Sequence, residues 1–229
     1  IRVSIFDFLM NFVDSKDLYQ AKTFDFDLIM EKLFILIKDM LLGNNITPSK
    51  VLGIGISIPG IVNEETKKIE VAPNLHIENK LLQSYNALFD VPVYFENEAN
   101  SAAYAEWQIG GAKKSKEVLY LSIMKGVGAG LVINNRLYHG AHFKSGEVGH
   151  IIIHRNGKKC TCGEYGCVNE YLSINALMKT YQKRSGKKDP SLSQFMEDYR
   201  GGKDAAVAIW KEYVTDFAFT IKTIITTID

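Results

Sequence analysis

The chain has 229 residues, enough for one large domain or two small ones. Its 27 Lys and Arg residues nearly balance its 26 Asp and Glu residues, so the formal charge is +1. This balance excludes a charge footprint for nucleic acid, a membrane surface or an acidic polymer. The 46% hydrophobic and 23% charged fractions exclude a largely disordered chain. No apolar run reaches the roughly 18–20 residues that a bilayer span needs.

Both ends of the sequence resemble the middle of a secondary-structure element rather than its boundary. The chain starts at Ile1 within an alternating pattern typical of a strand, and it stops at Asp229 at the end of a long apolar pattern. Because a domain rarely begins inside a core strand, we expect a fragment trimmed at both ends. The start also lacks the basic, apolar and small-residue regions that a signal peptide has in that order.

The first part of the chain alternates between strand and helix patterns. Asn97 predicts the N-cap of an alanine-rich helix that runs to about Ile109 and ends at a Gly-Gly pair. The elements expected before this helix are a strand over residues 1–8, a helix over 27–43, a buried strand over 51–58, a hairpin with its tip at 64–66, a helix over 81–89 and a strand over 91–95.

The second part continues this alternation and ends in apolar residues at three- and four-residue steps, which predict one long helix. Alternating strands and helices predict an α/β fold, and the hairpins make its sheets mixed. We place the internal boundary so that residues 1–97 and 98–229 form two lobes. The elements expected after Ile109 are strands over 118–124 and 130–134, a turn at 134–135, a cysteine-rich loop over 155–168, a helix over 168–182, a surface loop over 183–190 and a helix over 203–228.

The three cysteines are few, odd in number and clustered, which does not resemble a disulfide framework. We therefore expect a reducing, cytoplasmic compartment. His150 precedes Cys160, Cys162 and Cys167, and one imidazole with three thiols is the ligand set of a closed tetrahedral zinc site. Four protein ligands leave no open position for water, so we expect a structural Zn²⁺. His154 is an alternative fourth ligand that the spacing neither favours nor excludes, and three reduced cysteines without metal are the alternative to the whole site.

The cysteine cluster belongs to a longer pattern. Glu147-Val148-Gly149-His150, nine further residues and then Cys-x-Cys-Gly-x-x-Gly-Cys resemble the signature of the ROK family, which contains repressors, open reading frames and sugar kinases. The resemblance implies an actin-like ATPase (ribonuclease H-like) fold of two α/β lobes with a sugar cleft between them and a zinc-clipped loop. It also favours His150 over His154 as the zinc ligand. Further stretches in family order are residues 53–62, 74–75, 96–100, 126–130 and 137–140.

The resemblance also implies which residues contact sugar hydroxyls. Carboxylates and amides suit this task because each can engage two vicinal hydroxyls. The family histidine can bind zinc through one ring nitrogen and sugar through the other. Family members usually carry Cys-x-Glu, whereas here Asn169 stands at that place and Glu170 follows it; the apolar-Ser stretch after Glu170 supports Glu170 as the match. The expected sugar-binding residues are Gly60, Asn97, Glu98, Glu147, His150 and Glu170.

Each of these acids also has a simpler interpretation. A single glutamate is more often a solvated surface residue, and an acid in the first turn of a helix, such as Glu98, interacts favourably with the helix dipole. Only the joint pattern assigns them to a sugar site.

Two positions depart from the family's sugar kinases. Those kinases carry Asp as the catalytic base where this chain has Glu98, and a misplacement of about 1 Å can lower a rate some 100-fold. Their phosphate-contacting turn resembles Gly-Thr-Gly, whereas the phosphate-loop remnant here is Gly126, Val127 and Gly128, without the hydroxyl. Both departures favour a protein that binds sugar and no longer transfers phosphate.

The resulting expectation is the sugar-sensing, effector-binding domain of a ROK-family transcriptional regulator that represses carbohydrate-utilisation genes. DNA would be bound through a helix-turn-helix domain absent from this chain, and the family implies a homodimer. One alternative is a glucokinase-like hexose kinase that uses ATP and Mg²⁺ with Glu98 as its base. The other is a degenerate structural domain without ligand. The sequence does not identify the sugar.

Overall fold

The computed structural model describes residues 1–18, 25–86 and 88–228, which belong to two compact units, Ile1–Ser101 and Ala102–Asp229. Each unit has a hydrophobic core of its own. The two lobes expected from the sequence, residues 1–97 and 98–229, and the cleft between them stay a prediction.

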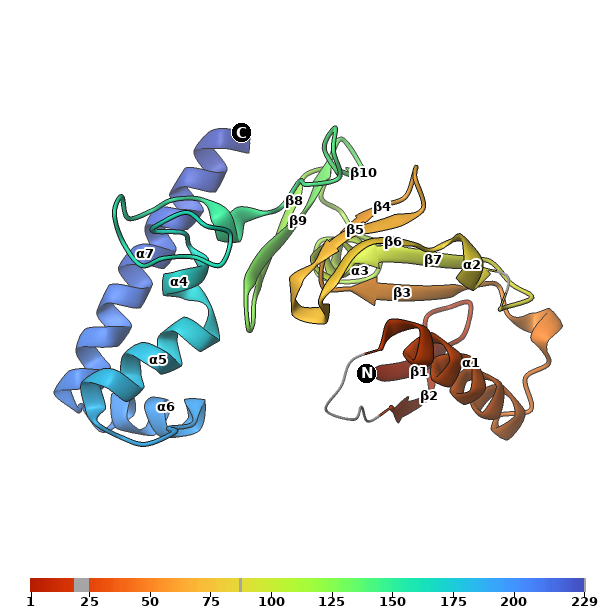
Figure 1. Ribbon diagram of the computed structural model, residues 1–229, viewed down its shortest axis with the longest axis horizontal. Coiled ribbons are helices and arrows are strands. Elements are labelled where there is room, and N and C mark those ends of the chain that lie inside the picture. Colours follow the sequence, from red (N-terminus) through yellow and green to blue (C-terminus); the bar gives the residue numbers. More distant parts are fainter. Residues whose placement is uncertain (19–24, 87, 229) are drawn as a thin grey trace. The chain divides into compact units, whose positions relative to one another are not determined.

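The first unit combines small sheets with one long helix (Figure 1). The helix α1 (Phe26–Gly43) begins at its N-cap Asp25, whose carboxylate accepts a hydrogen bond from the Leu28 N–H at 3.1 Å. Its apolar face packs on the strands through residues such as Met30. The strands are β1 (Arg2–Phe6) antiparallel to β2 (Phe12–Asp17), β3 (Ile54–Ile58) parallel to β7 (Val93–Asn97), and an antiparallel sheet of β4 (Ile61–Asn63), β5 (Lys68–Ala72) and β6 (Ile77–Leu81).

The segment before β7 differs from the sequence-based expectation. The predicted helix over residues 81–89 is shorter in the structure, since the helix α2 covers only Gln83–Asn86 and Leu81 is the last residue of β6. β6 pairs with β5 from Ile77 opposite Ala72 to Leu81 opposite Lys68, so the ladder satisfies this backbone. β6 itself was not expected from the sequence, since its pairing with β5 is a tertiary contact.

The helix predicted after Asn97 is confirmed as α3 (Glu98–Gln108). The Asn97 Oδ1 accepts hydrogen bonds from the N–H groups of Ala99 at 2.8 Å and Asn100 at 3.2 Å, which makes Asn97 its N-cap. The strand β7 therefore leads directly into a capped helix, and Asn97 lies at that junction. The buried strand expected over 51–58 is β3, in which only Ile58 is fully buried and Gly55 and Ser57 are exposed, so this part of the expectation is wrong.

The second unit begins with an antiparallel sheet and continues with helices (Figure 1). Its strands are β8 (Val118–Ile123), β9 (Val127–Ile133) and β10 (Arg136–Leu137), in the order β10-β9-β8. After a short 3-10 helix at Val148–His150 and the cysteine-rich loop come α4 (Asn169–Leu172), α5 (Ile174–Ser185), α6 (Leu192–Arg200) and α7 (Asp204–Ile228). The predicted C-terminal helix is thus confirmed as α7.

Two helical details were not expected from the sequence. The helix predicted over 168–182 is interrupted at Ser173, whose hydroxyl donates to the Asn169 carbonyl at 2.7 Å and accepts from the Ala176 N–H at 3.1 Å. This residue closes α4 and caps α5. The helix α6 was missed altogether, although Ser191 and Gln194 form a capping box at its start.

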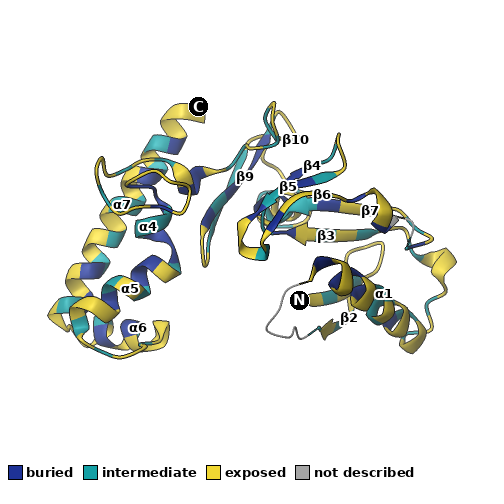
Figure 2. Ribbon diagram, viewed as in Figure 1, coloured by how far each residue is buried: buried dark blue, intermediate teal, exposed yellow. Residues whose placement is uncertain are grey.

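The helices α5, α6 and α7 pack around Tyr181, Phe195 and Ile209, all of which are buried. Figure 2 shows buried positions alternating with exposed ones along α5 and α7, as expected for amphipathic helices. In the part of the chain that the structure describes, no helix has the length and hydropathy that a bilayer span requires.

Candidate functional site

The cysteine-rich loop folds into a knuckle held by its own backbone. The Cys160 N–H donates to the Glu164 carbonyl at 2.8 Å, and Ile152 forms an isolated antiparallel bridge with Cys167. Gly166 adopts a left-handed φ of 83°, and a Cβ there would lie 1.7 Å from the His154 carbonyl oxygen. Only glycine fits this position, so the spacing of the three cysteines depends on it.

His150, Cys160, Cys162 and Cys167 meet at one point. Their candidate ligand atoms all lie within 4.8 Å of one another. The sulfurs of Cys162 and Cys167 are 3.7 Å apart, and the Cys160 sulfur is 3.7 Å from the His150 Nδ1. In a tetrahedron with Zn–S bonds of about 2.3 Å and Zn–N bonds of about 2.1 Å, the corresponding ligand separations are about 3.6–3.8 Å. These four side chains therefore form a candidate metal-binding cluster whose geometry fits zinc.

The two histidines have separate positions. His150 ends the short 3-10 helix and directs its Nδ1 toward the cluster. His154 instead places its Nε2 2.9 Å from an Asp216 carboxylate oxygen on α7 and stacks against Tyr171. The cluster consequently includes His150 and excludes His154, which the cysteine spacing by itself could not decide.

The protonation of the thiols is set by their surroundings. Burial raises the pKa of the Cys167 thiol to about 12, and its sulfur neighbours add to the shift. For Cys162, the backbone hydrogen bond at Glu164 is the main cause that lowers the pKa. A buried thiol of this kind becomes a thiolate when a cation offsets its charge, which is the chemistry of a metal ligand.

Glu147 lies beside the metal cluster. One of its carboxylate oxygens is 3.9 Å from the His150 Nε2, the ring nitrogen that faces away from Cys160. Loss of hydration raises the pKa of the Glu147 carboxyl, while the nearby His150 and Lys144 partly offset this shift. The structure thus brings Glu147 and His150 together, as the sequence predicted for two sugar-binding residues, and their binding of a sugar stays a prediction.

Asn169 connects the phosphate-loop remnant to the metal-binding region. Its Oδ1 accepts a hydrogen bond from the Val127 N–H at 2.6 Å, directly after Gly126 in the β8–β9 turn. Its amide is also close to Gly149, where a Cβ would lie 2.8 Å from the Asn169 side chain. No role was predicted for Asn169 from the sequence. The sequence signal that could have indicated a role is its position two residues after the last cysteine, where family members usually carry glutamate.

Glu170 occupies a different environment from Asn169. It lines a cleft together with His154 and Lys158, and its carbonyl accepts a hydrogen bond from the Lys158 Nζ at 2.9 Å. Glu147 and His150 are not among the residues that line this cleft. The assignment of Glu170 to the sugar site stays a prediction, and the contacts of Asn169 with Val127 and Gly149 make Asn169 a second candidate.

The remaining candidate residues lie in the first unit. The Asn97 Nδ2 donates to the Gly60 carbonyl at 2.8 Å, so the structure brings these two residues together at the ends of β7 and β3. A Cβ on Gly60 would lie 2.4 Å from the Val71 carbonyl oxygen, which explains the glycine. Glu98 is exposed in the first turn of α3. Sugar binding by these residues stays a prediction.

Comparison with solved structures defines the class of protein first. A ROK-family transcriptional regulator, a homologue of the E. coli MLC protein, superimposes with a TM-score of 0.86 over 98% of this chain and 59% of its own, at 24% identity. A ROK-family glucokinase from Streptomyces griseus superimposes with a TM-score of 0.80 over 99% of this chain and 76% of its own, at 22% identity. The predicted fold class is confirmed: the protein has the actin-like ATPase fold of these sugar kinases and regulators, with a loop that carries a candidate Cys/His metal cluster.

The chain belongs to the ROK family, whose family model matches residues 13–229. The xylose repressor of Bacillus spizizenii is 43% identical over 142 residues, which cover 62% of this chain and 37% of the repressor. A glucokinase of Streptomyces coelicolor is 32% identical over 148 residues, which cover 64% of this chain and 46% of the glucokinase. The chain therefore spans less than half the length of these curated relatives.

Proposed function

We propose that this chain is the sugar-sensing, effector-binding part of a ROK-family transcriptional regulator that no longer transfers phosphate. The observation that carries the proposal is the hydrogen bond from the Val127 N–H to the Asn169 Oδ1 at 2.6 Å. Backbone N–H groups of a glycine-rich turn bind phosphate when they are free. Here the N–H that follows Gly126 is engaged by a side chain, and Val127, which is 7% exposed, offers no hydroxyl.

The catalytic position adds to this argument. Glu98 is exposed at the start of α3, where the family's kinases carry an aspartate as base. The added methylene moves the carboxylate by about a bond length, which is enough to lower a proton-transfer rate strongly. The repressor names of several relatives are consistent with a regulator, and they make xylose the first sugar to test.

Structural zinc is part of the same proposal. We assign Zn²⁺ to His150, Cys160, Cys162 and Cys167, where it would hold the loop that also carries the Glu147–His150 pair. In this arrangement the His150 Nε2 and the Glu147 carboxylate remain available for sugar hydroxyls. DNA contact would come from a helix-turn-helix outside this chain, in a dimeric cytoplasmic protein. Sugar would act by binding one arrangement of the regulator more tightly than another.

The test combines sugar binding with a phosphotransfer assay on the full-length protein. We expect calorimetry to detect one sugar from a panel that includes xylose and glucose, and a coupled ATP assay to detect no turnover. Glu147→Gln should weaken that binding by about tenfold or more, because a charged hydrogen-bond acceptor is lost. Glu164→Gln, an exposed glutamate of the same loop, is the matched control and should bind as the unchanged protein does.

Turnover at rates ordinary for a kinase, about 1–100 per second, would replace this proposal by the second candidate, a hexose kinase. The glucokinase relatives and the glucokinase-like fold favour that candidate. Absence of heat across the whole panel, together with absence of turnover, would leave a structural domain instead.

A further inference from the structure

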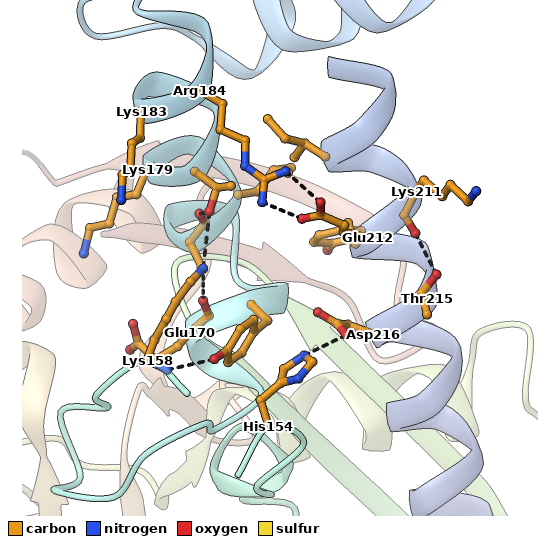
Figure 3. Close-up of a pocket in the computed structure, with 16 residues that line it drawn as sticks. His154, Lys158, Glu170, Lys179, Lys183, Arg184, Lys211, Glu212, Thr215 and Asp216 are labelled. Carbon is orange, nitrogen blue, oxygen red and sulfur yellow. Dashed lines mark hydrogen bonds and ion pairs between the residues drawn. The ribbon is translucent and has the colours of Figure 1, made fainter. Parts of the chain in front are cut away.

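The second unit contains a cleft that the proposed sugar and metal sites do not explain. It has a volume of about 700 Å³ and lies between the metal-binding loop, α5 and α7 (Figure 3). Sites for small molecules commonly span about 300–1,000 Å³. Glu170 is the one expected sugar-binding residue along it. The side chains used below come from residues 154–158 of the loop, from α4 and α5, and from residues 209–216 of α7.

The cleft has an apolar floor. Ala176, Leu177 and Ile209 line it and are at most 6% exposed. The ring of Tyr213 also lines it and is held in place, since its hydroxyl donates to the Leu172 carbonyl at 2.9 Å. This floor can receive the apolar part of a ligand at a fixed position.

Some of the charged groups around the cleft are already paired. The Arg184 guanidinium binds both carboxylate oxygens of Glu212, at 2.7 and 2.8 Å. His154 contacts Asp216 at 2.9 Å. Figure 3 shows these two contacts linking the α5 and loop side of the cleft to α7. Two of the three carboxylates that line the cleft, Glu212 and Asp216, are therefore already paired with other residues that line it.

Three lysines on the loop and α5 side of the cleft are not balanced in this way, and a fourth lysine without an ion-pair partner among the described residues, Lys211, lies on α7 (Figure 3). The Lys158 Nζ donates to two neutral acceptors, the Glu170 carbonyl at 2.9 Å and the Thr180 hydroxyl at 3.3 Å, and lies 4.6 Å from the centre of the Tyr171 ring. Lys179 and Lys183 are four residues apart and share one side of α5 (Figure 3). Among the described residues, none of these three ammonium groups has a carboxylate ion-pair partner. Glu170 is the single unpaired carboxylate facing them.

We propose that this cleft binds a small molecule carrying a phosphate monoester, with the phosphate at the side of Lys158, Lys179 and Lys183 and an apolar body on the floor of Leu177 and Ile209. A phosphate monoester carries about −1.5 to −2 charges and three acceptor oxygens at neutral pH. Together with Glu170, it offsets the charge of the three ammonium groups and leaves little net charge on this side of the cleft. With Glu170 counted, a monocarboxylate would leave one of these ammonium groups unbalanced, and a neutral ligand would leave two.

The test uses phenyl phosphate as the probe on the metal-loaded chain, followed by NMR of the backbone amides. We expect saturable shifts at residues of α5 and α7 that line the cleft. Benzoate and phenol, which have the same ring with one charge or none, should bind about tenfold more weakly or not detectably, since a charge-assisted hydrogen bond contributes about a factor of ten or more. Inorganic phosphate should also bind more weakly, because it does not reach the apolar floor.

A double variant locates the phosphate. Lys179→Gln with Lys183→Gln should weaken phenyl phosphate binding about tenfold or more. Lys113→Gln with Lys114→Gln removes the same charge from exposed positions outside the cleft and should bind as the unchanged chain does. Equal melting temperature and metal content would exclude misfolding as the cause of any loss.

Three results would overturn the proposal. Absence of saturable shifts at the cleft would mean that it takes no phosphate ester. An equal loss in both double variants would mean diffuse attraction to basic residues. Equal affinity for phenyl phosphate, benzoate and phenol would mean that the lysines do not select the ligand.

Discussion

Asn169 and Glu170 are adjacent in α4, and the role of each depends on the direction of its side chain as much as on its position in the sequence. Successive residues of a helix point about 100° apart, because one turn takes about 3.6 residues. The Asn169 side chain reaches the Val127 N–H, whereas Glu170 lines the cleft with Lys158. Two adjacent residues thus belong to different environments: Asn169 contacts the turn at Gly126–Gly128, and Glu170 lines the cleft.

The contact of Asn169 with Val127 can be tested by replacing its side chain. Asn169→Ala leaves a nearly buried N–H without a partner, so we expect the free energy of unfolding to fall by about 1–3 kcal/mol. The Val127 amide should also exchange its hydrogen faster. Asn169→Asp keeps the acceptor oxygen and serves as the matched control, with protection of Val127 retained. Urea unfolding and amide exchange measure both effects; equal exchange in the two variants would contradict the assigned contact.

At the scale of elements, α6 is fixed to its neighbours by one nearly buried carboxylate. Asp198 is 8% exposed and lies 2.8 Å from the Lys187 Nζ and 2.7 Å from the Lys203 Nζ; the Tyr181 hydroxyl also donates to it. The hydrogen bond from Lys187 is the largest cause that lowers the pKa of Asp198, followed by those from Lys203 and Tyr181. A single carboxylate thereby connects α5, α6 and the start of α7.

This network predicts how stability depends on pH. A carboxyl whose pKa is lower in the folded state stabilises that state above its unfolded pKa, about 3.9, and this stabilisation is lost as the pH falls toward the folded value. Asp198→Asn should therefore be less stable than the unchanged chain at pH 7, with a difference that shrinks below about pH 4. Asp189→Asn, which removes the same charge from an exposed position in the loop before α6, is the control. Urea unfolding at several pH values between neutral and acid measures the free energy of unfolding of each variant. If this free energy depended on pH in the same way in both variants, the stabilising role of Asp198 would be contradicted.

At the scale of the whole molecule, the chain consists of two units with separate cores, and the metal-binding cluster belongs to one of them. The loop around the cluster contributes few buried apolar side chains; Cys160, Cys167 and Val168 are its buried members. We therefore expect its order to depend on metal bound at the cluster. Bound structural zinc contributes on the order of 10–16 kcal/mol of apparent folding free energy in small peptides.

Removal of the metal should accordingly affect the second unit alone. We expect a strong zinc chelator to lower the melting temperature by about 10 °C or more, because a loss of several kcal/mol shifts a protein of this size by a few degrees per kcal/mol. Amide exchange should rise in residues 150–170 and their neighbours and stay unchanged in residues 1–101. Cys167→Ser should show the same loss without chelator and respond little to it. Metal analysis that finds well under one zinc per chain, or equal loosening of both units, would contradict the proposal.

Much of the fold could be predicted because the relevant signals are local. The apolar periods of α1 and α7, the cap at Asn97 and the spacing of the cysteines each depend on residues close in sequence. The failures have the opposite character. β6 was not predicted, because its backbone is satisfied by hydrogen-bond partners from β5. α6 was missed although its capping box is local, since its short apolar face gains stability only against α5 and α7.

The sequence by itself determined the family pattern and predicted the members of the candidate metal cluster apart from the choice between two histidines, since a knuckle of closely spaced thiols needs no distant partner. The tertiary structure decided the rest. It turned the His150 Nδ1 toward the cysteines and His154 toward Asp216, it placed Asn169 against Val127, and it gathered three lysines of a loop and a helix around one cleft. Those outcomes depend on which way side chains point and on elements far apart in the chain, and such information exists only once the chain is packed.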